Sequence, residues 1–594
     1  MFTTRPQLLG TMGMATSTHW LASAAGMAVL EEGGNAFDAA VAMGLTLHVV
    51  EPHLNGFGGD APIIGHDART ASTWVICGQG TAPAAATIGA FGELDLDLVP
   101  GTGHLPAVVP GAFGAWLELL ARHGAMPLDR LFRFAIGYAR DGYPLVPQAV
   151  DTITAVADLF TEHWPTSAEI YLPGGTPPVA RSRFANPQLA ATLQKIVDHA
   201  MAAGSTREAQ IEAARRYFYD GPIAEAIADY VAGTAVMDST GTPHSGLLSY
   251  DDLASWRATV EAPATVDFQG YTVAKTGAWG QGPVMLQQLA MLDTMDLAAT
   301  AAGSAELVHT VVEVAKLAFA DREAYYGDPD FSAVPLDALL SPEYSRSRAA
   351  LVTGVASADL RPGTLDGAST RLPGMVSTDR SRAPRAAGTG EPTVQRSGVT
   401  RGDTCHLDVV DRWGNMVSAT PSGGWLQSSP AIPGLGFGLP TRGQMFWLEP
   451  GLPNSLEPRK RPRTTLSPGL VLRDGAPYLA FGTPGGDQQD QWPVPFLINH
   501  LVFGLDLQVS IDAPNWHSTH MPSSFYPRDS EPLGLHVESR IGAGVIADLE
   551  RRGHVVTESG PWTLGRISAA GIRADGMLVA AANARGMQGY AAGR

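Results

Sequence analysis

The stretch that decides the fold is residues 402–411, Gly-Asp-Thr-Cys-His-Leu-Asp-Val-Val-Asp. From Thr404 onward it predicts a buried strand, followed by a turn at 413–415 and a second strand at 416–420. Before it, residues 378–403 are rich in Ser, Thr, Arg, Gly and Pro and have almost no apolar periodicity. Such a segment is typical of a linker or an exposed, protease-sensitive loop. Thr404 therefore stands where a flexible segment meets a core strand.

A hydroxyl residue in this position could become a new N-terminus. An N-terminal threonine carries its own general base, because its α-amine titrates near pH ~8 and can take the hydroxyl proton. A second interpretation is that Thr404 only begins a strand, as β-branched residues often do. The stretch by itself leaves both interpretations open.

Composition limits the class of protein. A chain of 594 residues exceeds the size at which one core usually stops growing, which favours two lobes. A hydrophobic content of 45% with 16% charged residues is that of a globular protein with ample core. The formal net charge of −18 argues against nucleic acid or an anionic membrane as a partner. Two cysteines, Cys77 and Cys405, cannot supply a disulfide framework or a four-cysteine zinc site.

Neither the start of the chain nor its apolar runs predict a targeting or membrane-spanning segment. The first ten residues lack the apolar core, about 7–15 residues long, of a signal peptide. No stretch reaches the roughly 18 uninterrupted apolar residues of a membrane span. We therefore expect a cytoplasmic protein with no membrane partner.

Apolar spacing divides the chain into a helix-rich first part and a strand-rich second part. It predicts helices at 21–30, 35–50, 111–140, 188–202, 207–231 and 304–322. It predicts further strands at 61–64, 265–275, 470–473, 478–481 and 571–581. A glycine loop at 55–60 connects the second helix to the first of these strands, and Gly33-Gly34 ends the first helix.

Several common catalytic motifs are missing from the sequence. There is no G-x-x-x-x-G-K-[ST], and the glycines at 434–438 lack the strand-then-helix context of a dinucleotide site. No H-E-x-x-H occurs and no close histidine pair sits on an evident helix face, so no metal site is predicted. A G-x-S-x-G elbow is also missing, which weighs against an α/β-hydrolase.

Two elements after Thr404 could carry chemistry. The hydroxyls of Thr464 and Thr465 could bond a nucleophile or a substrate, or could simply cap a turn. Gly485 and Gly486 follow a strand and could aim successive backbone N–H groups at one oxygen, as in an oxyanion hole. A tight turn without catalytic role is the alternative for the glycines.

Taken together, these residues give the chain a resemblance that runs from end to end. It resembles the γ-glutamyltransferase (glutathione hydrolase) family of N-terminal-nucleophile hydrolases, and within it the amidohydrolase and acylase branch. The stretches that carry the resemblance before Thr404 are 18–19, 33–42, 50–53, 56–60, 172–175, 318–322 and 327–330. Those from the cleavage motif onward are 402–404, 411–418, 460–468 and 482–486.

The resemblance implies an α+β fold, a four-layer αββα sandwich, made as a precursor that cuts itself between Asp403 and Thr404. Residues 1–403 would form the large subunit and 404–594 the small subunit. Both products would contribute to each core sheet and stay associated. We expect a homodimer of processed heterodimers as the assembly.

The resemblance also implies roles for individual residues. Thr404 would be nucleophile and amine base, attacking a small-molecule amide to form an acyl-enzyme that water or another amine releases, with no cofactor. The supporting residues are a hydroxyl that bonds the nucleophile, Ser422; an oxyanion hole, Gly485 and Gly486; and a pair near the donor's carboxylate, Thr464 and Thr465.

Two departures from the family concern the substrate. Enzymes that act on γ-glutamyl groups hold the α-carboxylate with an arginine, and here Gln79 stands in its place. They hold the α-amino group with an acid after an Asn-Asn-Gln-type run, and here 441–446 contains no acid. Burying each charge of glutamate without a partner costs several kcal/mol. We therefore expect Arg442 to bind the carboxylate of an acyl group without an α-amino group; the alternative is that Arg442 forms a structural ion pair outside the pocket.

The predicted function is thus a self-cleaving N-terminal-threonine amidohydrolase or acyltransferase acting on an amide with a carboxylate-bearing acyl group. Three alternatives stay open from the sequence. The first is a genuine γ-glutamyl transferase, and the second is an unprocessed, non-catalytic relative that serves as a binding protein. The third is an acylase that uses Cys405.

Overall fold

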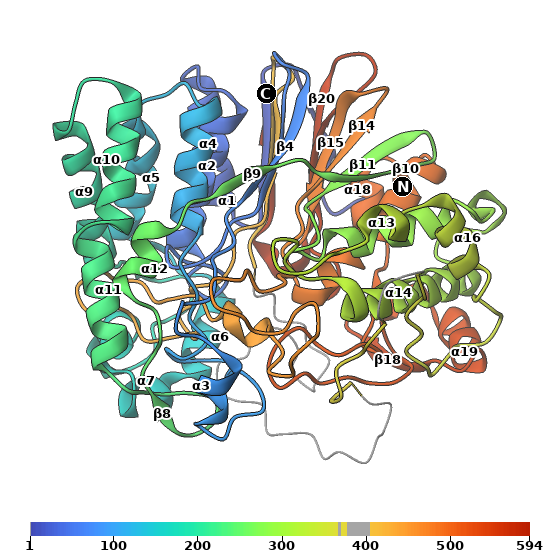
Figure 1. Ribbon diagram of the computed structural model, residues 1–594. Coiled ribbons are helices and arrows are strands. Elements are labelled where there is room, and N and C mark those ends of the chain that lie inside the picture. The colour runs from blue at the N-terminus through green and yellow to red at the C-terminus, as the bar shows by residue number, and fades with distance from the viewer. Residues whose placement is uncertain (1, 366–369, 377–403) are drawn as a thin grey trace.

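The computed structural model describes residues 2–365, 370–376 and 404–594 (Figure 1). The predicted flexible segment 378–403, including Asp403 of the predicted cleavage site, lies outside the described residues.

Two seven-stranded sheets form the centre of the molecule. The first runs in the order β1 (Leu8–Gly10), β20 (Leu578–Ala582), β19 (Ser568–Ile572), β15 (Ala476–Gly482), β14 (Gly469–Arg473), β11 (Tyr271–Lys275), β10 (Ala264–Phe268). The second runs in the order β21 (Tyr590–Gly593), β2 (Gly13–Ser17), β12 (Leu407–Asp411), β13 (Met416–Ala419), β3 (Ile63–Asp67), β4 (Ser72–Cys77), β9 (Thr259–Glu261). Neighbouring strands within both sheets are antiparallel. Each sheet combines strands from before and after position 403, as the resemblance implies.

The sheets stack face to face and helices cover their outer faces (Figure 1). Strand β12 illustrates the layering, because successive side chains of a strand point to opposite faces. Leu407 and Val409 pack toward the helices, whereas Val410 packs against the other sheet. The second sheet is covered by α1 (Trp20–Glu31), α2 (Ala36–Val50), α4 (Ala112–His123) and α5 (Leu128–Asp141). The first is covered by α13 (Gly282–Leu292) and α14 (Ala305–Tyr325), which completes the predicted αββα sandwich.

The remaining elements surround this sandwich. The other helices are α3 (Ile88–Gly92), α6 (Pro147–Ala155), α7 (Ala157–Glu162), α8 (Pro165–Tyr171), α9 (Pro187–Ala202), α10 (Arg207–Tyr219), α11 (Pro222–Gly233), α12 (Tyr250–Ser255), α15 (Leu336–Leu339), α16 (Pro342–Ala349), α17 (Pro493–Leu497), α18 (Leu507–Asp512) and α19 (Ala543–Arg551). A three-stranded sheet contains β16 (Trp516–Ser518), β17 (Gly534–Glu538) and β18 (Val555–Ser559). Two short pairs are β5 (Tyr143–Pro144) with β6 (Arg183–Phe184), and β7 (Val236–Met237) with β8 (Pro243–His244). Instead of two separate lobes, the chain has two large apolar cores on opposite sides of one pair of sheets.

The helices before residue 51 follow the prediction closely. In α2, Asn35 is the N-cap and Asp38 completes a capping box, and all fifteen residues of the helix are buried. Two longer predicted helices are wrong as single elements. The segment 111–140 breaks into α4 and α5 at Gly124–Pro127, and 207–231 breaks into α10 and α11 at Gly221, which precedes a proline.

Two predicted strands are likewise wrong as single elements, because each is a hairpin. Residues 265–275 form β10 and β11, which turn at Gln269 (φ 53°) and Gly270 (φ 80°). Residues 571–581 lie in β19 and β20, whose turn contains Gly576 (φ 81°). Positive φ angles end a strand, and glycine adopts them without steric penalty.

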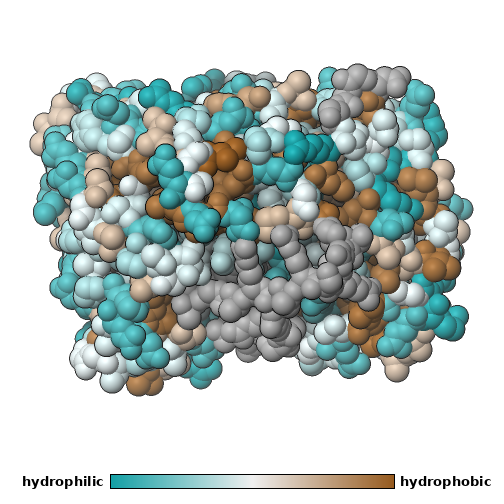
Figure 2. Space-filling model, turned by 60° about the horizontal axis from the view of Figure 1, so that its bottom comes forward, coloured by the Kyte–Doolittle hydropathy of each residue, from teal (hydrophilic) through white to brown (hydrophobic). Residues whose placement is uncertain are grey.

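No helix among the described residues is long and apolar enough to cross a membrane. Figure 2 shows one face of the molecule, on which apolar residues occur in small groups between hydrophilic ones.

Candidate active site

Thr404 is fully buried just ahead of β12, and two other segments meet it there. An antiparallel bridge pairs Thr404 with Ser422, and their hydroxyl oxygens lie 3.1 Å apart. Asp60 pairs with the same serine: its N–H donates to the Ser422 carbonyl (2.7 Å), and the Ser422 N–H donates to the Asp60 carbonyl (2.9 Å). A Cβ on Gly59 would lie 2.1 Å from the Ser422 carbonyl oxygen, so this approach requires glycine. The structure thus joins the glycine loop 55–60 to the predicted nucleophile and Ser422.

Arg442 lies against Asp60. Its Nε donates to Asp60 Oδ2 at 2.6 Å, and both side chains are fully buried. The Trp425 ring centre is 5.0 Å from the guanidinium carbon. The two terminal nitrogens, Nη1 and Nη2, are buried and have no hydrogen-bond partner among the described residues. The structural ion pair expected as the alternative therefore exists. However, its Asp60 pairs with Ser422, the residue that also pairs with Thr404, and the two terminal nitrogens of Arg442 remain without a partner among the described residues.

Asp60 is a site residue that sequence reasoning did not single out. Burial raises the pKa of its carboxyl to about 6, while the neighbouring Arg442 acts to lower it. The signal in the sequence was an acid that ends the glycine loop. Nothing in the local pattern connected that acid with an arginine 382 positions later.

The other predicted substrate-binding residues are also buried. Gln79 follows β4, in a segment that runs beside the glycine loop, where the Ala61 N–H donates to the Gly78 carbonyl at 3.2 Å. Gln79 Oε1 and Thr465 Oγ1 have no hydrogen-bond partner among the described residues. Thr464 Oγ1 accepts from the Leu466 N–H (3.3 Å), as expected of a turn cap. No hydrogen bond among the described residues links these three side chains to Thr404, so their substrate roles stay predictions.

The glycine turn after β15 lies near the start of β12. A Cβ on Gly482 would meet the His406 ring at 2.3 Å, which places the end of β15 directly against the chain that follows Thr404. Gly485 (φ 127°) and Gly486 (φ 53°) both have backbone angles that L-residues rarely adopt. A Cβ on Gly485 would also meet the Trp492 ring at 2.4 Å. The turn is therefore tight, as expected of a turn without catalytic role. It also lies close to the chain that follows Thr404, and the role of its glycines as an oxyanion hole stays a prediction.

Cys405 is held by buried polar groups on the helix side of the sheet. Its Sγ donates to Glu51 Oε2 at 2.9 Å and accepts from Asn55 Nδ2 at 3.1 Å. Burial raises the pKa of Glu51, and hydrogen bonds from Cys405 and Thr18 oppose that rise. Cys405 belongs to the core under α2, so its side chain packs as a structural group.

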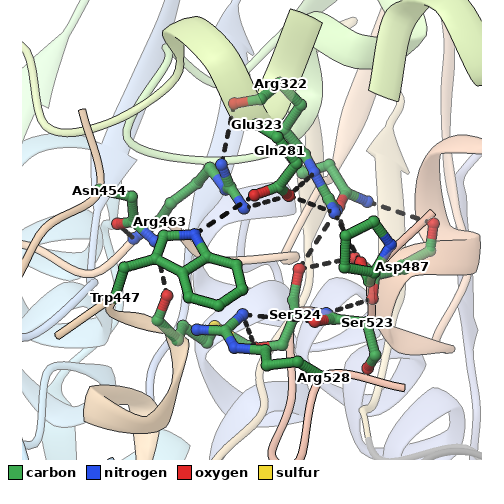
Figure 3. A network of polar contacts seen from close by, with 12 residues as sticks. Gln281, Arg322, Glu323, Trp447, Asn454, Arg463, Asp487, Ser523, Ser524 and Arg528 are labelled. Carbon is green, nitrogen blue, oxygen red and sulfur yellow. Dashed lines mark hydrogen bonds and ion pairs between the residues drawn. The ribbon is translucent and has the colours of Figure 1, made fainter. Parts of the chain in front are cut away.

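Asp487, the residue after Gly486, joins a buried polar network (Figure 3). It forms an ion pair with Arg322, the buried arginine near the end of α14. Glu323 accepts from both Arg322 Nη2 (2.8 Å) and Arg463 Nη2 (2.6 Å). The network therefore connects segments from both sides of position 403. Arg322 lies in the stretch 318–322 that carried the family resemblance, and Asp487 directly follows another such stretch, 482–486, but no local pattern pairs the two residues.

One cluster outside this site has ligand types found at metal centres. Ligand atoms of His309, Glu313 and His554 lie within 4.8 Å of one another. However, Glu313 already forms ion pairs with Lys316 and with Arg361, the latter at 3.5 Å. Because protein cations already match the carboxylate, we do not interpret the cluster as a metal site.

The fold and the site together define a class of protein. A four-layer αββα sandwich with a buried threonine ahead of a central strand, a second hydroxyl beside it and a glycine turn nearby is the arrangement of N-terminal-nucleophile hydrolases. Within that class the chain belongs to the γ-glutamyltransferase family, because residues 22–593 match the family model described as gamma-glutamyltranspeptidase.

Similar proteins narrow the activity. The oxamate amidohydrolase proenzyme of Klebsiella pneumoniae is 31% identical over 564 residues, covering 92% of each chain. A crystal structure of cephalosporin acylase from Bacillus halodurans has a TM-score of 0.83 at 27% identity and covers 100% of this chain and 98% of its own. A structure of LmbA2991HD has a TM-score of 0.94 at 54% identity, with full coverage of both chains. The chain is accordingly an enzyme that hydrolyses amide bonds.

Proposed function

We propose that the protein is a self-cleaving amidohydrolase whose nucleophile is Thr404 and whose substrate is a small amide with a carboxylate in its acyl group. The observation that carries the proposal is the buried Thr404 hydroxyl, 3.1 Å from the Ser422 hydroxyl ahead of β12. The cut would leave two associated chains, 1–403 and 404–594. A homodimer of these heterodimers stays the predicted assembly.

The reaction follows from the chemistry of an N-terminal threonine. The freed α-amine takes the proton of Thr404 Oγ1 as the oxygen attacks the amide carbonyl. The developing negative charge on the carbonyl oxygen meets the N–H groups of Gly485 and Gly486, and each such donor is typically worth ~2.7–4 kcal/mol. The C–N bond breaks, the proton passes to the leaving amine, and water hydrolyses the resulting ester. An amine in place of water would give acyl transfer.

The acyl pocket is proposed from the buried charges of Asp60 and Arg442, because Asp60 pairs with Ser422, which also pairs with Thr404. Nη1 and Nη2 of Arg442 form a fork that matches a carboxylate. Among the described residues, Asp60 is the only carboxylate that pairs with the guanidinium group of Arg442. Because this pairing neutralises its charge, Asp60 is poorly suited to hold an α-ammonium group. An acyl group with a carboxylate and no α-amine satisfies these partners better than a γ-glutamyl group. The oxamate amidohydrolase is named for a substrate of this kind.

A denaturing gel with an activity assay tests the proposal. Wild-type protein of 62.4 kDa should give bands near ~42 and ~20 kDa, at about 0.11 kDa per residue. Thr404→Ala should give one band and release no ammonia from oxamate. The matched control is Cys405→Ala, which should be cut and active, because Cys405 packs into the core. An active Thr404→Ala, or a wild type that is never cut, would contradict the proposal.

A further inference from the structure

We infer that Asp487 and Arg322 are positioning residues, which fix the glycine turn Gly485-Gly486 by a contact across the predicted subunit boundary. The inference rests on the proposed function, in which the amides of this turn stabilise the oxyanion. It adds two side chains, one from each side of the predicted cut, on which the geometry of that turn depends.

The turn needs a restraint from outside itself. Glycine loses more conformational freedom on folding than any other residue, and here two adjacent glycines hold φ angles of 127° and 53°. Oxyanion donors act only when they lie about 2.7–3.1 Å from the position of the developing charge. On one side, the Trp492 ring packs where a Cβ of Gly485 would stand. On the other side, the restraint comes from the next residue, Asp487.

Asp487 is held through its side chain and its main chain (Figure 3). Its Oδ2 accepts from the Ser524 N–H (2.8 Å), and its Oδ1 accepts from Ser524 Oγ (2.6 Å) and from Arg322 Nη1. Its backbone carbonyl lies 3.3 Å from Gln281 Nε2, which donates to it. Arg322 and Gln281 precede position 403, whereas Ser524 and Asp487 follow it. Asp487, which follows the two glycines, thus forms hydrogen bonds with residues of both predicted subunits.

Arg322 has no donor nitrogen left for a substrate. Its Nε and Nη2 donate to Glu323 at 3.1 and 2.8 Å, and Nη2 also donates to the Pro522 carbonyl at 3.1 Å. Its Nη1 donates to Asp487, to Gln281 Oε1 and to Ser524 Oγ. A buried ion pair is weak evidence for stability, because desolvation offsets the attraction. A saturated pair attached to a turn of two adjacent glycines therefore points to control of geometry.

The test compares Asp487→Asn with wild type in oxamate hydrolysis, with the ammonia released as the readout. The near-isosteric change removes the ion pair and one acceptor while it keeps the volume. We expect kcat to fall about tenfold or more and KM to stay within about twofold, because the turn acts on the transition state. The matched control is Asp321→Asn. Asp321 is one residue before Arg322, is fully buried and pairs with Arg348 at 3.3 Å, but its hydrogen bonds among the described residues do not reach the turn.

A second variant covers the case in which Asp487→Asn does not fold. Ser524→Ala removes the 2.6 Å hydrogen bond to Asp487 and leaves the ion pair in place. It should lower kcat about three- to tenfold, the size expected for the net contribution of one typical hydrogen bond. A lower thermal midpoint with unchanged kcat in both variants, or an equal loss of kcat in Asp321→Asn, would overturn the inference alone. A wild type that is inactive, or an active Thr404→Ala, would overturn the proposed function and this inference with it.

Discussion

Two buried arginines near the site are each paired with an aspartate, but they differ in how many of their hydrogen-bond donors are unused. Arg442 meets Asp60 at the end of the glycine loop 55–60, and Arg322 meets Asp487 just after the glycine turn. The two terminal nitrogens of Arg442 have no partner among the described residues, whereas every guanidinium nitrogen of Arg322 is engaged. The unused donors, more than the charge itself, therefore distinguish an arginine that can bind a ligand from one that positions the backbone.

Energetics supports this distinction. A buried donor without a partner costs about 1–3 kcal/mol, and more when it is charged. A carboxylate that enters beside Arg442 would remove that cost at two donors at once. The Arg322 network gains nothing from a ligand, because it is complete without one.

The largest expected effect is a rise in KM when Arg442 is replaced, an effect that we do not expect at Arg322. Arg442→Gln should raise KM for oxamate and for a glutaryl anilide by about 10²–10³-fold, because two charge-assisted hydrogen bonds are lost. Hydrolysis of γ-glutamyl anilide should be poor in both proteins. The measurement is steady-state kinetics on processed enzyme.

The matched control for this experiment is Arg348→Gln. Arg348 is also a buried arginine paired with an aspartate, but its partner is Asp321, a residue of α14. The Arg348→Gln variant should have the same KM as the wild type for these amides. An unchanged KM for the anionic amides in Arg442→Gln would mean that the ion pair with Asp60 is purely structural.

A smaller effect should appear in kcat at the other arginine. Arg322→Gln and Asp487→Asn should each lower kcat about tenfold, and the double variant should lower it by little more than either alone. The reason is that both changes remove the same restraint on the glycine turn. Fully multiplicative losses in this double-mutant cycle would show that the two side chains act independently.

The smallest expected effect is a pH dependence of stability at Asp60. Burial raises the pKa of this carboxyl to about 6, from ~3.9 in an unfolded chain. Between these values the folded protein keeps a proton that the unfolded chain releases. The stabilisation is therefore complete below about pH 4 and is lost as the pH rises through about 6.

The Asp60→Asn variant lacks this titrating carboxyl group, so the difference between wild type and variant reports the titration of Asp60 alone. The thermal midpoint of wild type minus that of the variant should fall by roughly 1–3 °C between about pH 4 and 6.5. The loss of a carboxylate partner for Arg442 in the variant does not titrate, so it contributes a constant offset to the difference. A difference that stays flat or rises over this range would contradict the assignment.

Local sequence patterns predicted the parts of the fold that local physics controls. The capping box at Asn35 and the apolar run of α2 specify that helix by themselves, and the short run of β12 with its adjacent valines favours a buried strand. The breaks in 111–140 and 207–231 were signalled by Gly124 and Gly221, whose effect the apolar periodicity on either side concealed. The hairpin at 265–275 depends on Gln269 with a positive φ, which composition does not announce.

The candidate site was predictable only in part, for a different reason. Thr404 and the two glycines of the turn could be named because they belong to short motifs, and Ser422 could be named because the family resemblance implies its role. Asp60 and Asp487 could not, because their roles come from partners far away in sequence, Arg442 and Arg322, which only tertiary packing brings near. Long-range pairs of buried charges leave no periodic trace in either segment.

The way the strands interleave determines when a cut could occur. In each central sheet, strands from before and after position 403 are hydrogen-bonded neighbours, as β2 and β12 are, or β11 and β14. Chains 1–403 and 404–594 made separately would each expose unsatisfied sheet edges in several places, which favours aggregation. Cleavage would thus have to follow folding of the complete sandwich. Two chains that were separated before folding should not assemble into it.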